Sequence, residues 1–286
     1  MTQARAPSRQ GYAVLAFPVV MLAVFFLGPF VAMLATSFYQ RIPGGFYETA
    51  FVFSNYARLF SKVFLERTAF SLGVSLLAAA ICVTVGFPFT YFLTRMRRRP
   101  HVALLILLLS ALSLSEVIVG FSWSVLLGRA SGISNILVWL GLMNEASPYA
   151  PGFWAVMLGL CYIAFPYCVL TLYPPLTRLD PEVTEAAHTL GASPWRTFRT
   201  VVIPIGRPSI LAAFLLAFIF TLGSYLIAAI LGRPEHWTLS VFISDQATFN
   251  ANVPFAAAMA MFLTVVSLGL VALVTVVETR TRGQKP

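Results

Sequence analysis

Charged residues are scarce in this chain of 286 residues: Asp, Glu, Lys and Arg together make up 10%, while 59% of the residues are apolar. Soluble domains are about 45–50% apolar and about 25% charged. Too few charges are therefore present to cover a water-facing surface, which leaves little room for a soluble enzyme and favours a multispan membrane protein. The net charge of +9 indicates no nucleic-acid partner, because basic residues at the cytoplasmic ends of spans give the same excess.

Cysteine and catalytic motifs are equally sparse. Cys82, Cys161 and Cys168 lie in apolar stretches and form neither a CxxC pair nor a zinc pattern, so we interpret them as small buried hydrophobic residues. The chain has no Gly-rich phosphate loop ending in Lys-Ser or Lys-Thr, no HExxH and no GxSxG. The sequence therefore predicts neither an enzyme nor a chain that hydrolyses ATP.

Long gaps between charged residues mark the candidate membrane spans, because about 20 apolar residues cross the hydrocarbon. We predict an all-α membrane protein in which six transmembrane helices form one domain over 1–286. The predicted spans are 12–38, 68–94, 102–128, 151–173, 208–231 and 254–277. The first apolar run continues to Gln40, which is longer than the core of a signal peptide, so we count it as a span.

Basic residues near the span ends predict the orientation. With the N-terminus inside, thirteen Lys and Arg residues lie on the cytoplasmic side and six on the other. The run from Arg95 to Arg99, between the second and third spans, contributes most to this asymmetry. Both termini are therefore predicted to be cytoplasmic.

The loop between the fourth and fifth spans has helix start and stop signals of its own. Asp180 is a good N-cap, and Pro181 suits the first helical position. Gly191 ends this helix, and Ser193 with Pro194 begins a second one. The sequence predicts two short helices joined by a tight turn, which rest under the membrane before the fifth span begins.

The same loop carries a spaced motif. Its residues are Glu185, Ala186 and Ala187, then Gly191 after three residues, and Pro204 near the end of the loop. In this register it resembles the EAA loop of permease subunits of binding-protein-dependent ABC importers. Val201 and Ile203 stand conservatively where that pattern has Ile and Leu. Together with the six spans, the residues around Gly191 resemble the polyamine-type branch of the family.

This resemblance implies a type I importer permease (MetI-like) fold with a cytoplasmic coupling helix between helices 4 and 5, in a loop at about 178–206. In the family this helix sits in a groove on a separate ATPase subunit, whose closure switches the permease between inward-open and outward-open states. Glu185 would be the charged contact, Ala186 and Ala187 would allow close approach, and Gly191 would permit the turn. The alternative is an amphipathic helix that binds lipid at the membrane surface.

Glu116 is the one charge well inside a predicted span, and such carboxylates usually face a bundle interior or a water-filled path. Ser122 and Trp123 follow it in the same span, while Ser224 and Tyr225 lie in the fifth span. We take these five as candidate residues of a substrate pathway, the last two by analogy with the family. Glu116 is either a counter-charge for a cationic solute or a structural residue, protonated or bonded to a neighbouring helix.

The predicted function is that of a permease subunit in an ATP-driven importer, which moves a small hydrophilic solute by alternating access. A polyamine or another amine-bearing compound is the leading solute. Other ABC cargoes, such as an opine, an amino-acid derivative, a phosphonate or ferric iron, stay open. A secondary, ion-coupled transporter and a membrane scaffold are the alternatives from other classes, although no convincing inverted repeat is visible.

The expected partners follow from the resemblance. They are a second permease subunit in a paralogous heterodimer, two ABC ATPases, an extracytoplasmic solute-binding protein and membrane lipids, with no nucleic acid. No cofactor is expected on this chain, since ATP and Mg would be bound by the partner ATPase. The expected location is the bacterial inner membrane.

Overall fold

The computed structural model describes residues 17–42, 44–45, 47–129, 132–142, 144–145 and 147–283. Within these ranges every regular element is a helix, apart from an isolated antiparallel bridge between Gln40 and Glu48. The described residues contain five helices that are long and apolar enough to cross a membrane, or six if one sharply bent pair counts as a single span. The predicted all-α membrane fold is therefore confirmed, while positions 12–16 of the first predicted span lie outside the described residues.

The chain divides into two compact units, and each is described by itself. Unit 1 comprises Met1–Phe64 and Ile243–Val266, and unit 2 comprises Leu65–Phe242 and Ser267–Pro286. The prediction of a single domain stays a prediction.

Unit 1 begins with an apolar helix over Phe17–Thr36, of which none of the membrane-length stretch is buried. It includes the π-helical turn η1 (Ala23–Leu27) and α2 (Gly28–Thr36), and the short helices α3 (Ser54–Ala57) and η2 (Arg58–Phe60) follow. The unit also holds most of the first half of α14 (Val253–Gly283). The Arg58 guanidinium lies 4.4 Å from the centre of the Phe255 ring, which holds η2 against α14.

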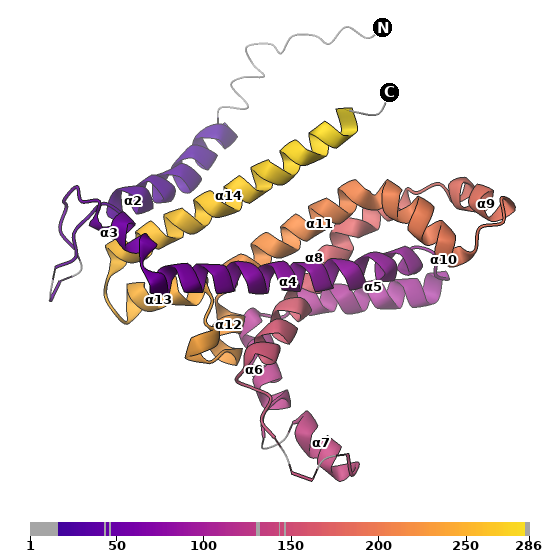
Figure 1. Cartoon of the computed structure of the whole chain (residues 1–286), viewed down its shortest axis with the longest axis horizontal. Coiled ribbons are helices and arrows are strands. Elements are labelled where there is room, and N and C mark those ends of the chain that lie inside the picture. The colour runs from indigo at the N-terminus through magenta and orange to yellow at the C-terminus, as the bar shows by residue number, and fades with distance from the viewer. Residues whose placement is uncertain are drawn as a thin grey trace, which may run out of the picture. The chain divides into compact units, whose positions relative to one another are not determined.

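Unit 2 is built around α8 (Phe153–Thr177), which contacts α5, α6, α11 and α12. Figure 1 shows α4, α5, α8 and α11 running along one another. The elements before α8 are α4 (Lys62–Leu93), α5 (Arg98–Ser113), α6 (Glu116–Leu126) and α7 (Ile133–Trp139). Those after it are α9 (Pro181–Thr189), α10 (Pro194–Thr197), η3 (Phe198–Val202), α11 (Ile203–Gly223), α12 (Leu226–Leu231) and η4 (Pro234–His236). The helix α13 (Leu239–Thr248) begins in unit 2 and passes into unit 1 after Phe242.

The helix predicted over 102–128 is interrupted in the structure. It ends at Ser113 and restarts at Glu116, and the two pieces, α5 and α6, are bent by 100°. Leu114 and Ser115 are both extended, with ψ angles of 134° and 140°. The Ser115 hydroxyl accepts a hydrogen bond from the Val117 amide at 3.3 Å, so it caps a new helix inside the apolar run.

The fifth predicted span, 208–231, differs from the structure at both ends: the helix begins earlier, at Pro194, and it breaks at Gly223, before the predicted end. The helix is continuous over Pro194–Gly223, because the π-helical turn η3 shifts the hydrogen-bond register and the Ile203 amide donates to the Phe198 carbonyl. This register change accommodates Pro204, which has no amide hydrogen to donate. The helix then stops at Gly223, Ser224 is extended, and α12 follows.

The packing of α8 on α12 predicts a strong size limit at Gly159. A Cβ at this position would lie 2.7 Å from Ile227 Cγ2 and 2.7 Å from Leu231 Cδ1, and both side chains are fully buried. Gly159→Leu should therefore destabilise the bundle by about 1–3 kcal/mol, lowering Tm by about 5 °C. Gly73→Leu is the matched control, since a Cβ on Gly73 meets nothing within 4 Å. Thermal unfolding in detergent measures both, and equal Tm values would contradict the predicted close approach.

Candidate functional site

The helix α9 starts and ends as the sequence predicts. The Glu182 amide donates to Asp180 Oδ1 at 2.9 Å, and Pro181 occupies the first turn. The second start is confirmed as well, because the Arg196 amide donates to Ser193 Oγ at 3.3 Å. These caps fix the entry of both short helices.

Gly191 closes α9 with a backbone turn. Its φ angle is +83°, and its amide donates to the His188 carbonyl at 2.9 Å. The next amide, that of Ala192, donates to the Ala187 carbonyl at 3.0 Å. This pair of hydrogen bonds is a Schellman motif, which needs a left-handed residue that is cheap only for glycine. His188 Nδ1 bonds the Ala192 carbonyl at 3.0 Å and supports the same turn.

One face of this hairpin is apolar and uncovered. Leu190 is 88% exposed and Trp195 is 69% exposed, while Glu185 and Ala186 are also exposed. Sequence periodicity groups Leu190 with the apolar face of α9 and Trp195 with that of the next helix, and the structure leaves both side chains exposed. An exposed apolar face flanked by a carboxylate is typical of a surface that binds another protein.

The other side of the hairpin is anchored in unit 2. Phe198 is buried, and its ring centre lies 5.8 Å from that of Phe87 and 5.2 Å from that of Tyr91, both on α4. Val202 is fully buried, and Pro204, which is half-buried, begins the continuation into α11. The second short helix of the hairpin is thus continuous with α11, in one helix over Pro194–Gly223.

A second site forms where the two helix breaks meet. The start of α6 and the break between α11 and α12 line a cavity of about 500 Å³. Its lining residues are Glu116, Ile219, Phe220, Gly223, Ser224, Tyr225 and Leu226. The structure therefore brings three of the five pathway candidates, Glu116, Ser224 and Tyr225, to one cavity.

Two polar side chains that line this cavity, Glu116 and Ser224, have no hydrogen-bond partner for their side-chain oxygens among the described residues. Ser224 is 5% exposed, and its hydroxyl has no hydrogen-bond partner. Among the described residues, no hydrogen bond or ion pair engages the Glu116 carboxylate, which lies partly exposed at the first position of α6. The described residues thus show no bond from Glu116 to a neighbouring helix, and its place on a substrate pathway stays a prediction.

The remaining two candidates lie elsewhere. Ser122 lines a separate hollow on the outer side of α6, and Trp123 packs edge-on against Tyr162 at 5.9 Å in an apolar cavity. Ser122 is six residues after Glu116, which turns it by about 240° around the helix. Trp123 returns to the face of Glu116, but it lies two turns further along.

Two features of the site escaped the sequence interpretation, although both left signals. Ser115 followed by Glu116 is a typical N-cap signal for the start of a helix, here inside an apolar run. Gly223 before Ser224 is a typical signal for the end of a helix. Within a membrane such breaks are tolerated only where the freed backbone lines a cavity or is buried in protein. Both breaks here do line one.

The cysteines lie between two helices of unit 2. The Cys82 thiol donates to the Cys161 carbonyl at 3.7 Å, and the Cys168 thiol donates to the Cys82 carbonyl at 3.5 Å, so they join α4 to α8. Over the described part of the chain, no group of three or more His, Cys, Asp or Glu residues could hold a metal ion.

Comparison with known proteins gives a consistent result. Residues 99–283 match the family described as binding-protein-dependent transport system inner membrane component. The spermidine/putrescine transport system permease protein PotB of Salmonella typhimurium is 31% identical over 255 residues, which cover 88% of each chain. PotB of Haemophilus influenzae is 29% identical over 85% of each chain.

The solved structures show a shared fold. A bacterial ABC transporter that imports the acidic polysaccharide alginate has a chain with a TM-score of 0.76 to this one, at 17% identity and 94% coverage of both chains. This similarity concerns the fold alone.

Proposed function

Because this chain belongs to the family of binding-protein-dependent transport system inner membrane components, we propose that its importer carries a polyamine or another small amine-bearing solute. The chain is a permease of an ABC importer and a multi-pass protein of the inner membrane. It is not itself catalytic and belongs to a family without a bound cofactor. Family membership argues against the alternative of a secondary, ion-coupled transporter. In this family the energy for transport comes from a separate ATPase.

The cavity at the two helix breaks carries this proposal. An ammonium group entering it would meet a lining that includes Glu116, Ser224 and Tyr225, of which Glu116 offers a carboxylate and Tyr225 an aromatic ring. A carboxylate and an aromatic ring are the groups that recognise ammonium ions in proteins. The similarity to spermidine/putrescine permeases points to the same solute class.

The α9 hairpin is the proposed contact with the motor. Glu185 would face a basic or donor-rich rim of the ATPase groove, while Ala186 and Ala187 keep the helix thin at the contact. Gly191 sets the turn, and Pro204 lies where the hairpin joins α11. The exposed Leu190 and Trp195 add an apolar anchor of the kind that dominates protein interfaces.

Complexes of this family include an ATPase and a binding protein as partners. In our proposal a second, paralogous permease completes the passage, two ATPases bind the α9 side, and the binding protein delivers the solute at the opposite surface. Both chain termini then lie in the cytoplasm, on the α9 side, as the count of basic residues predicts.

Glu116→Gln tests the proposed pathway. Loss of the charged hydrogen bond should raise the KM for spermidine uptake about tenfold or more, because hydrogen bonds to charged groups contribute about 1.5–3 kcal/mol. The measurement is ATP-dependent uptake of labelled spermidine by the complete transporter in proteoliposomes. Glu145→Gln is the control, since this carboxylate is exposed in the loop before α8.

Two outcomes would contradict the proposal separately. An unchanged KM for spermidine in Glu116→Gln would remove Glu116 from the pathway. Uptake of a phosphonate, ferric iron or an amino-acid derivative by the wild-type transporter, with no uptake of any polyamine, would refute the solute class.

A further inference from the structure

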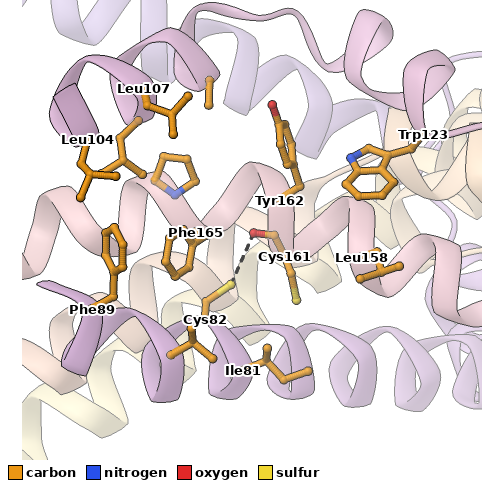
Figure 2. Close-up of a pocket in the computed structure, with 14 residues that line it drawn as sticks. Ile81, Cys82, Phe89, Leu104, Leu107, Trp123, Leu158, Cys161, Tyr162 and Phe165 are labelled. Atoms are coloured by element: carbon orange, nitrogen blue, oxygen red, sulfur yellow. Dashed lines mark hydrogen bonds between the residues drawn. The ribbon is translucent and has the colours of Figure 1, made fainter. Parts of the chain in front are cut away.

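An apolar cavity of unit 2 has no part in the proposed pathway. It lies between α4, α5, α6 and α8 and has a volume of about 570 Å³. Figure 2 shows the side chains of Ile81, Leu104 and Phe165 converging on it from different helices. Its lining residues are Ile81, Cys82, Val85, Phe89, Leu104, Leu107, Leu108, Ala111, Trp123, Leu158, Cys161, Tyr162, Phe165 and Pro166.

Water in this cavity would find few hydrogen-bond partners, so filling it with water is unfavourable. The lining has no charged side chain, and its polar side-chain atoms belong to Trp123, Tyr162 and two thiols. Both thiols, those of Cys82 and Cys161, already donate to backbone carbonyls. An apolar cavity of about 150 Å³ stays dry and binds hydrocarbon. A cavity several times larger, in the membrane-spanning part of the chain, requires a hydrocarbon occupant.

The cavity opens towards the outside of unit 2. Val85 is 53% exposed and Leu107 is 65% exposed, so its rim on α4 and α5 faces whatever surrounds the protein. The lining stripe of α5 continues at three- and four-residue spacing from Leu107 through Leu104 and Pro100 to Arg97, the N-cap. The apolar groove therefore leads into a basic turn.

The basic turn, Arg97–Arg99, has no acidic side chain paired with it among the described residues. Arg97, Arg98 and Arg99 are all exposed. Arg95 differs, because its guanidinium lies 3.8 Å from the centre of the Tyr91 ring. The turn is held to the bundle by His101, whose ring bonds the Leu93 carbonyl at 2.8 Å and the Tyr173 hydroxyl at 2.9 Å.

The dimensions match one leaflet. From Arg99 to Ala111 the helix rises about 18 Å, and half the hydrocarbon core of a bilayer is about 15 Å. We propose that the cavity between α4, α5 and α8 binds an anionic phospholipid, with an acyl chain in the apolar space and its phosphate at Arg97–Arg99. A zwitterionic lipid would fill the space equally well but would gain less from the three cations.

The test uses the assembled transporter in nanodiscs of phosphatidylcholine doped with brominated phosphatidylglycerol or brominated phosphatidylcholine. Bromine on the acyl chain quenches a nearby indole, and Trp123 lines the cavity. The quenching of Trp123 is the part of the signal that disappears in Trp123→Phe. This part should saturate at a lower fraction of brominated phosphatidylglycerol than of brominated phosphatidylcholine. Replacing Arg97, Arg98 and Arg99 with glutamine should weaken the phosphatidylglycerol preference by about fivefold per arginine.

A pair of α5 variants separates the cavity from the general lipid surface. Leu107→Trp fills the rim of the cavity and should abolish the quenching of Trp123. Because the new tryptophan is also quenched, the quenching of Trp123 is measured as the difference between Leu107→Trp and the double variant Leu107→Trp, Trp123→Phe. Leu109→Trp is the control, because Leu109 is 53% exposed on α5 and does not line the cavity.

Three results would overturn the site. They are equal saturation by the two lipids, unchanged quenching in Leu107→Trp, and quenching that appears in the isolated chain but not in the assembled transporter. The last would mean that a partner permease covers the cavity. None of these results bears on spermidine uptake, so the site and the proposed function fail independently.

Discussion

Glu185→Lys is expected to abolish ATP-driven uptake while leaving the abundance and membrane insertion of the protein unchanged. The side chain is exposed on α9, and among the residues that the structure describes no hydrogen bond or ion pair engages its carboxylate. Charge reversal at a docking contact places like charges together, which costs several kcal/mol. We therefore expect uptake to fall about 100-fold or more. The measurements are solute uptake and solute-stimulated ATPase activity of the reconstituted complex, together with binding of the ATPase to the permease.

Glu182→Lys is the matched control for this experiment. It makes the same charge change three residues earlier, on the first turn of the same exposed helix. The cost there is limited to about 1 kcal/mol from the helix dipole. Uptake at the wild-type rate in Glu185→Lys, or an equal loss in both variants, would count decisively against a specific role of Glu185.

Gly191→Val is expected to reduce coupled uptake about tenfold by strain alone. Gly191 has a φ of +83°, and a Cβ there would meet no atom within 4 Å, so crowding plays no part. A left-handed conformation costs an L-residue about 1–2 kcal/mol, and β-branched residues adopt it least readily. The strain would be relieved by opening the turn, which displaces Glu185 relative to α10. Uptake and ATPase stimulation should fall together.

Gly191→Asn distinguishes backbone strain from loss of the glycine itself. Asparagine tolerates the left-handed region, so this variant should keep at least about a third of the wild-type uptake rate. If Val and Asn were equally harmful, the surface at 191 and not its backbone conformation would matter to the partner.

Much of this architecture could be read from the sequence because the signals were local. The gaps between charges located the membrane-length helices, and Asp180, Ser193 and Gly191 marked the α9 hairpin by side chains that act within a few residues. The extension of α11 back to Pro194 could not be read in this way. It depends on a π-helical turn whose widened register compensates for Pro204, and Pro204 taken alone indicates a stop.

The candidate site was harder to predict from the sequence, because it depends on where two helix breaks meet in space. Glu116 lies more than 100 positions before Ser224 and Tyr225 along the chain, and the packing of α6 against α12 brings it to them. Gly120 allows that approach, because a Cβ there would lie 2.9 Å from the Ile230 side chain. Trp123 and Ser122 were chosen for their proximity in sequence to Glu116, and the helix directs them to other surfaces.

The position of Glu116 at the first residue of α6 affects how firmly it can hold a cation. The amino end of a helix carries about half a positive elementary charge, directed here at the same point as the carboxylate. On the proposed pathway, an ammonium group would therefore meet a field smaller than that of an isolated anion, and its residence there would be correspondingly brief. A partly cancelled attraction of this kind would suit a binding site on a transport pathway, which the solute must leave as readily as it enters.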